Sequence, residues 1–144
     1  PPVKSDISVN DFFEDLRQLF ADPRIAFNSP KTPLPWKADR GQMEQVFINL
    51  IKNAQEACQN NPSALISVCA HTTDEQWEFT ITDNGEGMLP EVTGRIFLPF
   101  FTTKPGGSGI GLALCKQITV LHGGQITVTT EPDKGSTFTL TFPM

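Results

Sequence analysis

The chain has 144 residues, of which 38% are hydrophobic and 19% are charged, and its formal net charge is −5. This length suits one domain with one core, and this composition excludes a disordered tail. The acidic balance argues against a general nucleic-acid platform, which normally carries a basic excess. No apolar run approaches the roughly 18–20 residues that span a bilayer.

The three cysteines, Cys58, Cys69 and Cys115, form no CxxC pair and no zinc-binding pattern. Reduced thiols are typical of a reducing compartment, so we expect a cytoplasmic domain. The chain begins with proline instead of methionine, and its start has no apolar signal-peptide core. We therefore expect a piece of a longer parent protein, and the sequence leaves open whether that parent is anchored to a membrane.

Patterning in the first half of the chain predicts three strands and two helices. The strands are expected at Ile7–Val9, Ile25–Phe27 and Leu34–Ala38. Asn10 is expected to cap a helix over Asp11–Phe20, in which apolar residues recur at helical spacing. Asp39 is expected to cap a longer helix that reaches Gln59 and carries one apolar stripe.

The second half predicts two antiparallel hairpins. Their strands are Leu65–Val68 with Trp77–Thr82, and Gln125–Thr130 with Thr137–Phe142. A helix over Gly111–His122 is ended by two glycines, and a shorter helix is expected near Glu91–Ile96. Together these elements predict an α+β two-layer sandwich, with a mixed, mostly antiparallel sheet and about three helices on one face.

The segment from Asp83 to Gly111, nearly thirty residues long, is rich in glycine and proline and has no period of its own. Such a long irregular segment is uncommon inside a compact domain and usually has a function, such as that of a lid. We therefore look for the chemistry in this segment and predict a lid over about residues 89–108.

Two asparagines of the long helix, Asn49 and Asn53, are four residues apart and project from one helix face. Helix asparagines are most often surface residues or caps. These two border the apolar stripe, where a partly desolvated amide needs a partner. An amide oxygen there is a suitable ligand for Mg²⁺.

The run Asp83-Asn84-Gly85-Glu86-Gly87 directly follows a predicted strand. Asp-Asn-Gly is an ordinary turn signal, but no return strand follows it. A carboxylate at a strand end can accept a hydrogen bond from an exocyclic amine, and the glycines let the backbone approach a flat base. This run is therefore a candidate for binding a nucleobase.

Two further clusters are weak evidence for a binding site when each is taken alone. The glycine-rich run Lys104–Leu112 leads into a helix, where backbone N–H groups and the helix dipole favour phosphate. It lacks the Gly-Lys-Ser/Thr sequence of a P-loop. Gly135-Ser136-Thr137-Phe138, at the start of the last strand, is by itself only a turn.

Together, the four clusters resemble those of the GHKL ATPase superfamily, which includes gyrase, the large heat-shock chaperone, histidine kinases and MutL-type repair proteins. The resemblance covers nearly the whole chain, from about Ile7 to Phe142, and implies the Bergerat fold. Arg95–Lys104 is similar to the F box of histidine kinases, and Gly109–Lys116 with His122-Gly123-Gly124 is also close to their pattern. Among these, the nitrogen-regulator type is the most similar.

The resemblance implies ATP and Mg²⁺ as cofactors. It makes Asn53 the metal ligand and Asn49 a support for the metal and the phosphates, both catalytic. Asp83 would accept a hydrogen bond from the adenine amine. Residues that would shape or reach the adenine pocket are Gly85, Gly87, Met88 and Thr137, the last through a water.

The phosphate side of the implied site lies later in the chain. Backbone N–H groups of the second glycine run would bind phosphate, in the segment Gly107, Ser108, Gly109, Ile110, Gly111 and Leu112. Phe100 and Lys104 would belong to the lid. Some histidine kinases place a lysine where this chain has Glu56, so Lys104 would supply the catalytic positive charge, in preference to Lys52.

The implied activity is transfer of the γ-phosphoryl group of ATP to a histidine on the dimerisation domain of the same parent protein. That parent would be a homodimer with a response regulator downstream, and nucleic acid is not an expected partner. Asn49 stands where hydrolysing relatives have a glutamate, so we expect a weak ATPase. His71 and His122 lack the sequence of a phosphate acceptor, and His122 is expected to cap helix carbonyls.

Two alternatives remain open from the sequence. The domain could be a nucleotide-gated interaction module that binds ATP and docks a partner without turnover. It could also be a serine kinase of the same superfamily, although the F box argues against that.

Overall fold

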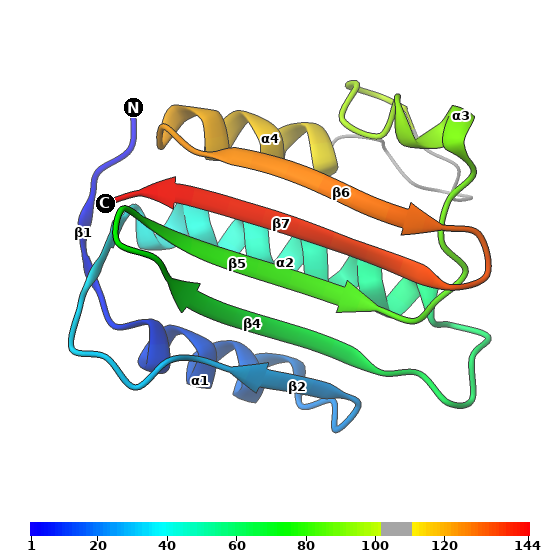
Figure 1. Ribbon diagram of the computed structural model, residues 1–144, viewed down its shortest axis with the longest axis horizontal. Coiled ribbons are helices and arrows are strands. Elements are labelled where there is room, and N and C mark those ends of the chain that lie inside the picture. Colours follow the sequence, from blue (N-terminus) through cyan, green and yellow to red (C-terminus); the bar gives the residue numbers. More distant parts are fainter. Residues whose placement is uncertain (102–110) are drawn as a thin grey trace.

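A five-stranded sheet with the order β2-β4-β5-β7-β6 forms one layer of the molecule (Figure 1). All neighbouring strands are antiparallel except β2 and β4, which are parallel. The computed structural model describes residues 1–101 and 111–144. The strands of this sheet are β2 (Ile25–Asn28), β4 (Ile66–Thr72), β5 (Gln76–Asp83), β6 (Gln125–Glu131) and β7 (Gly135–Pro143).

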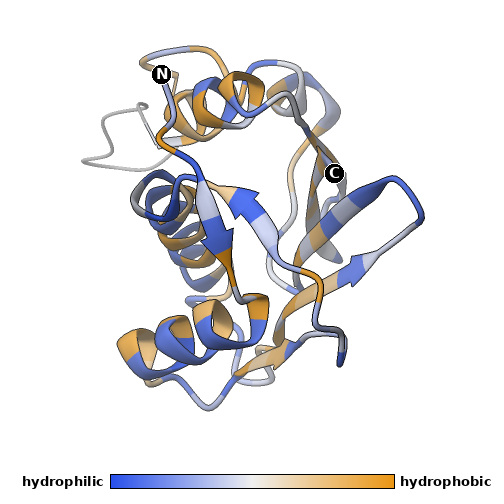
Figure 2. Cartoon of the chain, turned by 90° about the vertical axis from the view of Figure 1, so that its left-hand side faces the viewer, coloured by the Kyte–Doolittle hydropathy of each residue, from blue (hydrophilic) through white to orange (hydrophobic). Residues whose placement is uncertain are grey.

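The second layer consists of helices that cover one face of the sheet (Figure 1). These are α1 (Val9–Phe20), α2 (Arg40–Ala57) and α4 (Gly111–Leu121), and a short α3 (Pro90–Thr93) lies beside them. Apolar and polar residues alternate around the helices (Figure 2), because each helix buries one stripe against the sheet. Two short strands, β1 (Ser5–Ile7) and β3 (Trp36–Ala38), pair separately. The α+β sandwich expected from the sequence is confirmed.

Aromatic rings fill the core between the two layers. Phe12, Trp36, Phe47 and Phe79 are at most 1% exposed, and Phe47 packs edge-on against Phe12 and Phe79 with ring centroids 5.2 and 5.3 Å apart. Edge-to-face packing at these distances adds to the free energy gained from burial. The core therefore holds α1 and α2 firmly on the sheet.

The start of the chain differs from the sequence prediction. The first strand is Ser5–Ile7 instead of Ile7–Val9, and α1 begins at Val9, two residues earlier than expected. Ser8, and not Asn10, is its N-cap, because the Ser8 side chain accepts the backbone N–H of Asp11. Val9 is buried as part of the helix, which favours the earlier start.

Asp39 caps α2 as predicted, with Oδ1 accepting the backbone N–H of Gln42 at 3.2 Å. The predicted pairings of β4 with β5 and of β6 with β7 are also confirmed. The molecule has two distinct ends (Figure 1). We call the end where β5 stops and β7 starts the Asp83 end, and the opposite end, where α2 begins, α4 finishes and both termini lie, the Asp39 end.

Candidate functional site

Asp83 is the last residue of β5 and is buried on the helix side of the sheet, with 5% exposed. Its Oδ1 accepts the backbone N–H of Gly85 at 2.9 Å. Burial raises the pKa of the Asp83 carboxyl, although backbone N–H groups of Gly85 and Ser136 favour its ionised form. A carboxylate has about four acceptor positions, so Asp83 can accept an exocyclic amine in addition to these two groups.

The turn after Asp83 passes close to two other segments and requires glycine to do so. A Cβ atom built on Gly85 would lie 2.4 Å from the carbonyl oxygen of Ala57, at the end of α2. Gly87 has a φ of +66°, and a Cβ there would lie 1.9 Å from the carbonyl oxygen of Glu131. The two glycines therefore bring the turn against α2 and β6, and their role in shaping an adenine pocket stays a prediction.

Thr137 does not lie with Asp83, contrary to the sequence prediction. Asp83 is opposite Ser136 in the register of β5 and β7, and Thr82 is opposite Thr137. Because side chains alternate between the faces of a strand, Asp83 and Ser136 lie on the buried helix side. The Thr137 hydroxyl lies on the other face, 3.1 Å from that of Thr82. Ser136, which is 7% exposed, therefore has the hydroxyl that lies on the same face of the sheet as Asp83.

Sequence reasoning missed the hydroxyl pair that supports this side of the site. The Ser136 and Thr130 hydroxyls are 2.8 Å apart, and Thr130 Oγ1 also accepts the backbone N–H of Met88 at 2.9 Å. These contacts join β6, β7 and the turn after Asp83. The register of the last hairpin would have revealed them, since Thr130 is opposite Ser136.

Asn84 is a second residue that the sequence did not single out. Its Oδ1 accepts the backbone N–H of Leu65 at 2.8 Å, and its Nδ2 donates to the carbonyl oxygen of Ser63 at 3.0 Å. Its backbone carbonyl accepts Nδ2 of Asn61 at 2.9 Å. Asn84 therefore ties the loop after α2 to the end of β5 and fixes the turn that follows Asp83.

Asn49 and Asn53 lie one turn apart on α2, and both are half-buried. Nδ2 of Asn49 donates to the Gln45 carbonyl at 2.9 Å. A Cβ atom on Gly111, the first residue of α4, would lie 3.0 Å from Oδ1 of Asn49. The side chain of Asn49 is therefore directly beside the start of α4, and the predicted roles of Asn49 and Asn53 toward phosphate and metal stay predictions.

The aromatic residues of the predicted lid divide into two groups. Phe97 packs edge-on against Phe138, with centroids 6.3 Å apart, and Phe101 is partly buried against the core. Phe100 is 76% exposed and has a φ of +67°, a left-handed conformation that is unusual for a bulky side chain. Met88 and Leu112, also predicted site residues, are partly buried against the core.

Five predicted site residues lie outside the residues that the structure describes. They are Lys104, Gly107, Ser108, Gly109 and Ile110. Their assignment to phosphate binding stays a prediction, as does the later part of the predicted lid.

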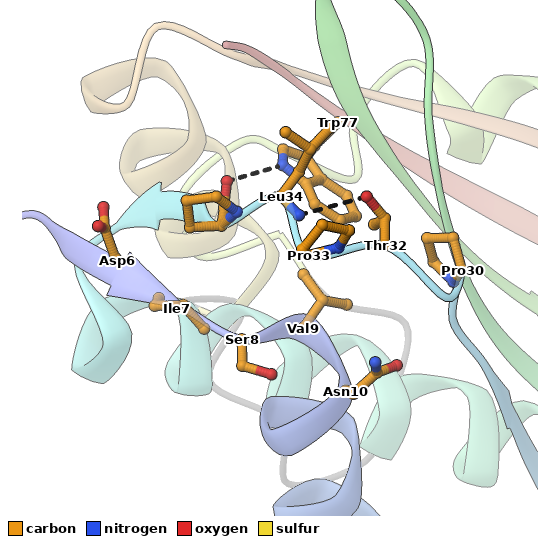
Figure 3. A pocket seen from close by; sticks show the side chains of 11 residues that line it. Asp6, Ile7, Ser8, Val9, Asn10, Pro30, Thr32, Pro33, Leu34 and Trp77 are labelled. Carbon is orange, nitrogen blue, oxygen red and sulfur yellow. Dashed lines mark hydrogen bonds between the residues drawn. The ribbon is translucent and has the colours of Figure 1, made fainter.

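A separate pocket of about 180 Å³ lies at the Asp39 end (Figure 3). Its lining includes Ser8, Val9, Thr32, Pro33 and Trp77. Trp77 is six residues before Asp83 on β5, so the two are about 20 Å apart. The pocket is also smaller than the roughly 300–1,000 Å³ of typical ligand sites, and none of the predicted site residues lines it.

A buried carboxylate at a strand end, a glycine-framed turn and a helix amide pair within an α+β sandwich together define the GHKL class of domains. The sequence matches the family described as "Histidine kinase-, DNA gyrase B-, and HSP90-like ATPase" over residues 38–144. The chain belongs to this family.

Curated relatives are kinases of greater length. Sporulation kinase D of Bacillus subtilis is 37% identical over 112 residues, which are 78% of this chain and 22% of that protein. The signal transduction histidine-protein kinase AtoS of Escherichia coli is 40% identical over 110 residues, which are 76% of this chain and 18% of that protein. The chain thus spans about a fifth of the length of these relatives.

Solved structures of histidine kinases share the fold. The nucleotide-free catalytic domain of ThkA aligns with a TM-score of 0.84 and 28% identity, over 98% of this chain and 95% of that one. Full-length ShkA in complex with AMPPNP aligns with a TM-score of 0.85 and 26% identity, over 99% and 31%. ThkA in complex with the response regulator protein TrrA aligns with a TM-score of 0.77 and 25% identity, over 99% and 42%.

Residues 1–101 and 111–144 contain no helix with the length and hydropathy that crossing a membrane demands.

Proposed function

We propose that this domain binds Mg–ATP and transfers the γ-phosphoryl group to a histidine on the dimerisation domain of a longer, homodimeric sensor kinase. A response regulator would then receive the phosphoryl group. Family membership, relatives named as histidine kinases and a similar structure in complex with a response regulator support this proposal. The observation that carries it is the buried Asp83 carboxylate at the Asp83 end of the sandwich.

The adenine end of the site follows from the geometry of Asp83. The carboxylate would accept the exocyclic amine of adenine, and guanine has a carbonyl oxygen in that position, which cannot donate. Ser136, on the same face of the sheet and opposite Asp83, would contact the base from β7. The Gly85–Gly87 turn would cover it. We therefore expect a preference for ATP over GTP.

The residues present fit a magnesium ion held mainly by the nucleotide. Mg²⁺ prefers oxygen ligands and usually keeps waters and phosphate oxygens in its shell, with few protein ligands. Among the described residues, no three His, Cys, Asp or Glu side chains gather into a metal site. The amide oxygens of Asn53 and Asn49 are hard donors one helical turn apart, and Asn49 lies beside the start of α4, so Asn53 would hold the ion with Asn49 in support. The ion would neutralise charge on the phosphates.

The described residues of the site favour transfer to an acceptor over hydrolysis. Asn49 has no useful basicity and cannot activate water. In the transfer, the bond between the γ-phosphorus and its bridging oxygen breaks, ADP leaves, and a nitrogen–phosphorus bond forms on the acceptor imidazole. The imidazole proton would pass to a group beside that histidine in its own domain. Lys104 and the N–H groups of the second glycine run would stabilise the phosphate charge.

The exposed part of the F box would contact the histidine-bearing domain. Leu98 is 54% exposed and Phe100 is 76% exposed, and both follow the short helix α3 closely. Left-handed backbone at a bulky residue is unfavourable by about 1–3 kcal/mol and persists where the surrounding structure imposes it. Phe100 is held toward solvent in that conformation, which suits a side chain that becomes buried in a partner.

The test is a reaction between this domain, radiolabelled ATP and a separately supplied dimerisation domain from the same parent protein. We expect labelling of the dimerisation domain, with a phosphate bond that is acid-labile, as for phosphohistidine. Phe100→Ala should reduce labelling about tenfold, the loss that follows from one well-buried aromatic contact, with nucleotide affinity unchanged. The exposed Leu65→Ala is the matched control. Binding of ATP without any labelling of wild type would favour an interaction module over a kinase.

A further inference from the structure

His122 lies at the end of α4, at the Asp39 end of the molecule, and has no part in the site described above. It is 5% exposed. Its Nδ1 is 2.9 Å from the carbonyl oxygen of Ile118, and its Nε2 is 3.0 Å from the backbone nitrogen of Asp39. The first contact is the carbonyl cap predicted from the sequence. The second contact crosses to another helix and was not predicted.

The two hydrogen bonds fix which ring nitrogen of His122 carries the proton. A backbone N–H can only donate, so Nε2 accepts from Asp39 and carries no proton. The neutral ring then carries its proton on Nδ1 and donates it to Ile118. Both nitrogens are therefore engaged inside the fold, and His122 cannot serve as a phosphate acceptor without breaking at least one of these bonds.

The Asp39 backbone nitrogen belongs to the cap of α2. The Asp39 carbonyl accepts the N–H of Met43 at 2.9 Å, and its carboxylate accepts the N–H groups of Gln42 and Val3. His122 thus joins the cap residue at the beginning of α2 to the end of α4. We call this the His122–Asp39 clamp.

The clamp and the phosphate side of the site lie at opposite ends of one helix pair. α2 and α4 run in opposite directions behind the sheet (Figure 1). Asn49 is ten residues beyond Asp39, and Gly111 is eleven residues before His122. At 1.5 Å per residue these distances are about 15 and about 16.5 Å, which are nearly equal, so joining Asp39 to His122 sets Gly111 beside Asn49.

Directional contacts matter here because apolar packing alone does not fix how far two helices slide along each other. Cys115 in the middle of α4 gives a weak hydrogen bond from Sγ to the Val46 carbonyl, at 3.6 Å. The clamp adds a stronger bond with a defined angle. His122 is itself held by the turn Gly123-Gly124 and by Phe142, whose ring centroid is 6.2 Å away.

We propose that His122 is a positioning residue for nucleotide phosphates: through the clamp it sets the register of α2 against α4, and so the placement of the Asn49–Asn53 face against the start of α4. The inference rests on the proposed binding of ATP. It concerns the phosphates alone, because Asp83 and Ser136 hold the adenine end through the sheet, independently of α4.

The test compares ligands that differ only in phosphate, using His122→Phe and His122→Gln. Phenylalanine keeps the ring packing and removes both hydrogen bonds, whereas glutamine keeps a donor and an acceptor. We expect His122→Phe to weaken Mg–ATP and Mg–ADP binding about tenfold and phosphotransfer about 100-fold, since small misplacements of reacting groups have effects of that size. Adenosine affinity should change less than about twofold, and His122→Gln should restore most of the phosphate-dependent affinity.

Measurements without nucleotide separate this proposal from the proposed function. In His122→Phe, the NMR signals of the Gly111 backbone amide and the Asn49 side-chain amide should shift, and hydrogen exchange at the Asp39 amide should accelerate. Leu121→Ala, an exposed change at the same helix end, should leave them in place. If His122→Phe does not fold, His122→Asn, which is too short to reach Asp39, replaces it.

Equal losses of adenosine and ATP affinity, or unmoved signals at Gly111 and Asn49, would overturn the positioning role. Wild-type protein that binds no adenine nucleotide would instead overturn the proposed function, while the NMR shifts would still report on the clamp.

Discussion

The two ends of the sandwich differ in how the hydrogen-bonding capacity of their polar groups is satisfied. At the Asp39 end, the Asp39 carboxylate accepts two backbone N–H groups, which lower its pKa, and His122 has both ring nitrogens bonded. At the Asp83 end, burial raises the pKa of Asp83, and Gly87 and Phe100 have left-handed backbone conformations. Strained or desolvated groups are typical of functional sites. The Asp39 end therefore maintains the geometry of the fold, whereas the Asp83 end has polar groups to which a ligand can still bind.

The largest effect that we predict is a loss of ATP affinity caused by a change at the Asp83 end alone. Asp83→Asn should weaken ATP binding by roughly 10- to 100-fold, because a charge-assisted hydrogen bond to the adenine amine contributes about 1.5–3 kcal/mol. Calorimetric titration with ATP and GTP measures this. Wild type should strongly prefer ATP, and equal affinities for the two nucleotides would contradict the assignment of Asp83.

The second-largest effect is a loss of nucleotide affinity that depends on Mg²⁺. Asn53→Ala should reduce Mg–ATP affinity and phosphotransfer by about tenfold, and it should leave ADP affinity measured in EDTA unchanged, because the side chain acts through Mg²⁺. Asn60→Ala, an exposed asparagine just past α2, is the control. A mutant that binds Mg–ATP as well as wild type would make Asn53 a packing residue.

The third prediction tests which face of the sheet contacts the nucleotide at the Asp83 end. Ser136→Ala should weaken nucleotide binding by about threefold to tenfold, the contribution of one neutral hydrogen bond. Thr137→Ala should have no measurable effect, because its hydroxyl lies with Thr82 on the other face of the sheet. The same titration checks both variants, and a larger loss in Thr137→Ala would reverse our correction.

The smallest effect is on stability, and its sign should be opposite at the two ends. The folded-state pKa of Asp39 lies below the ordinary value of 3.8, so its carboxylate stabilises the fold above that pH, and the stabilisation is lost as pH falls through the depressed value. The pKa of Asp83 is raised, so its ionised form destabilises the fold at neutral pH, and this effect disappears as pH falls through the raised value.

Thermal unfolding of the nucleotide-free domain between pH 7 and pH 3 tests these signs. At pH 7, Asp39→Asn should unfold at a lower temperature than wild type, and Asp83→Asn should unfold at the same or a higher temperature. Both differences should narrow in acid. A clear loss of stability in Asp83→Asn at pH 7 would mean that Asp83 is a structural residue and not one held ready for a ligand.

Local signals made much of the fold predictable. Asp39 caps α2 as its sequence indicates, and the alternation in β4 and β5 predicted their pairing. The start of α1 was missed because Ser8 and Asn10 are both good caps, and only the burial of Val9 distinguishes them. Choosing between two local signals of equal strength requires the tertiary structure.

The places of Asp83 at a strand end and of the Asn49–Asn53 pair on one helix were predictable from local sequence patterns. The place of a residue was not predictable where strand register decides. Ser136 and Thr137 are neighbours with similar hydroxyl groups, and a shift of one residue reverses which of them faces Asp83. The His122–Asp39 contact joins residues 83 positions apart, so no local pattern could indicate it.

The location of both termini at the Asp39 end has a mechanical consequence (Figure 1). β5 runs from that end to Asp83 with eight residues, a lever arm of about 24 Å. If the domain is connected to other domains through its termini, the pivot lies beside the clamp. Each degree of rotation about that pivot then carries the Asp83 end through an arc of about 0.4 Å, so a turn too small to disturb the pivot can still move the Asp83 end toward or away from an acceptor.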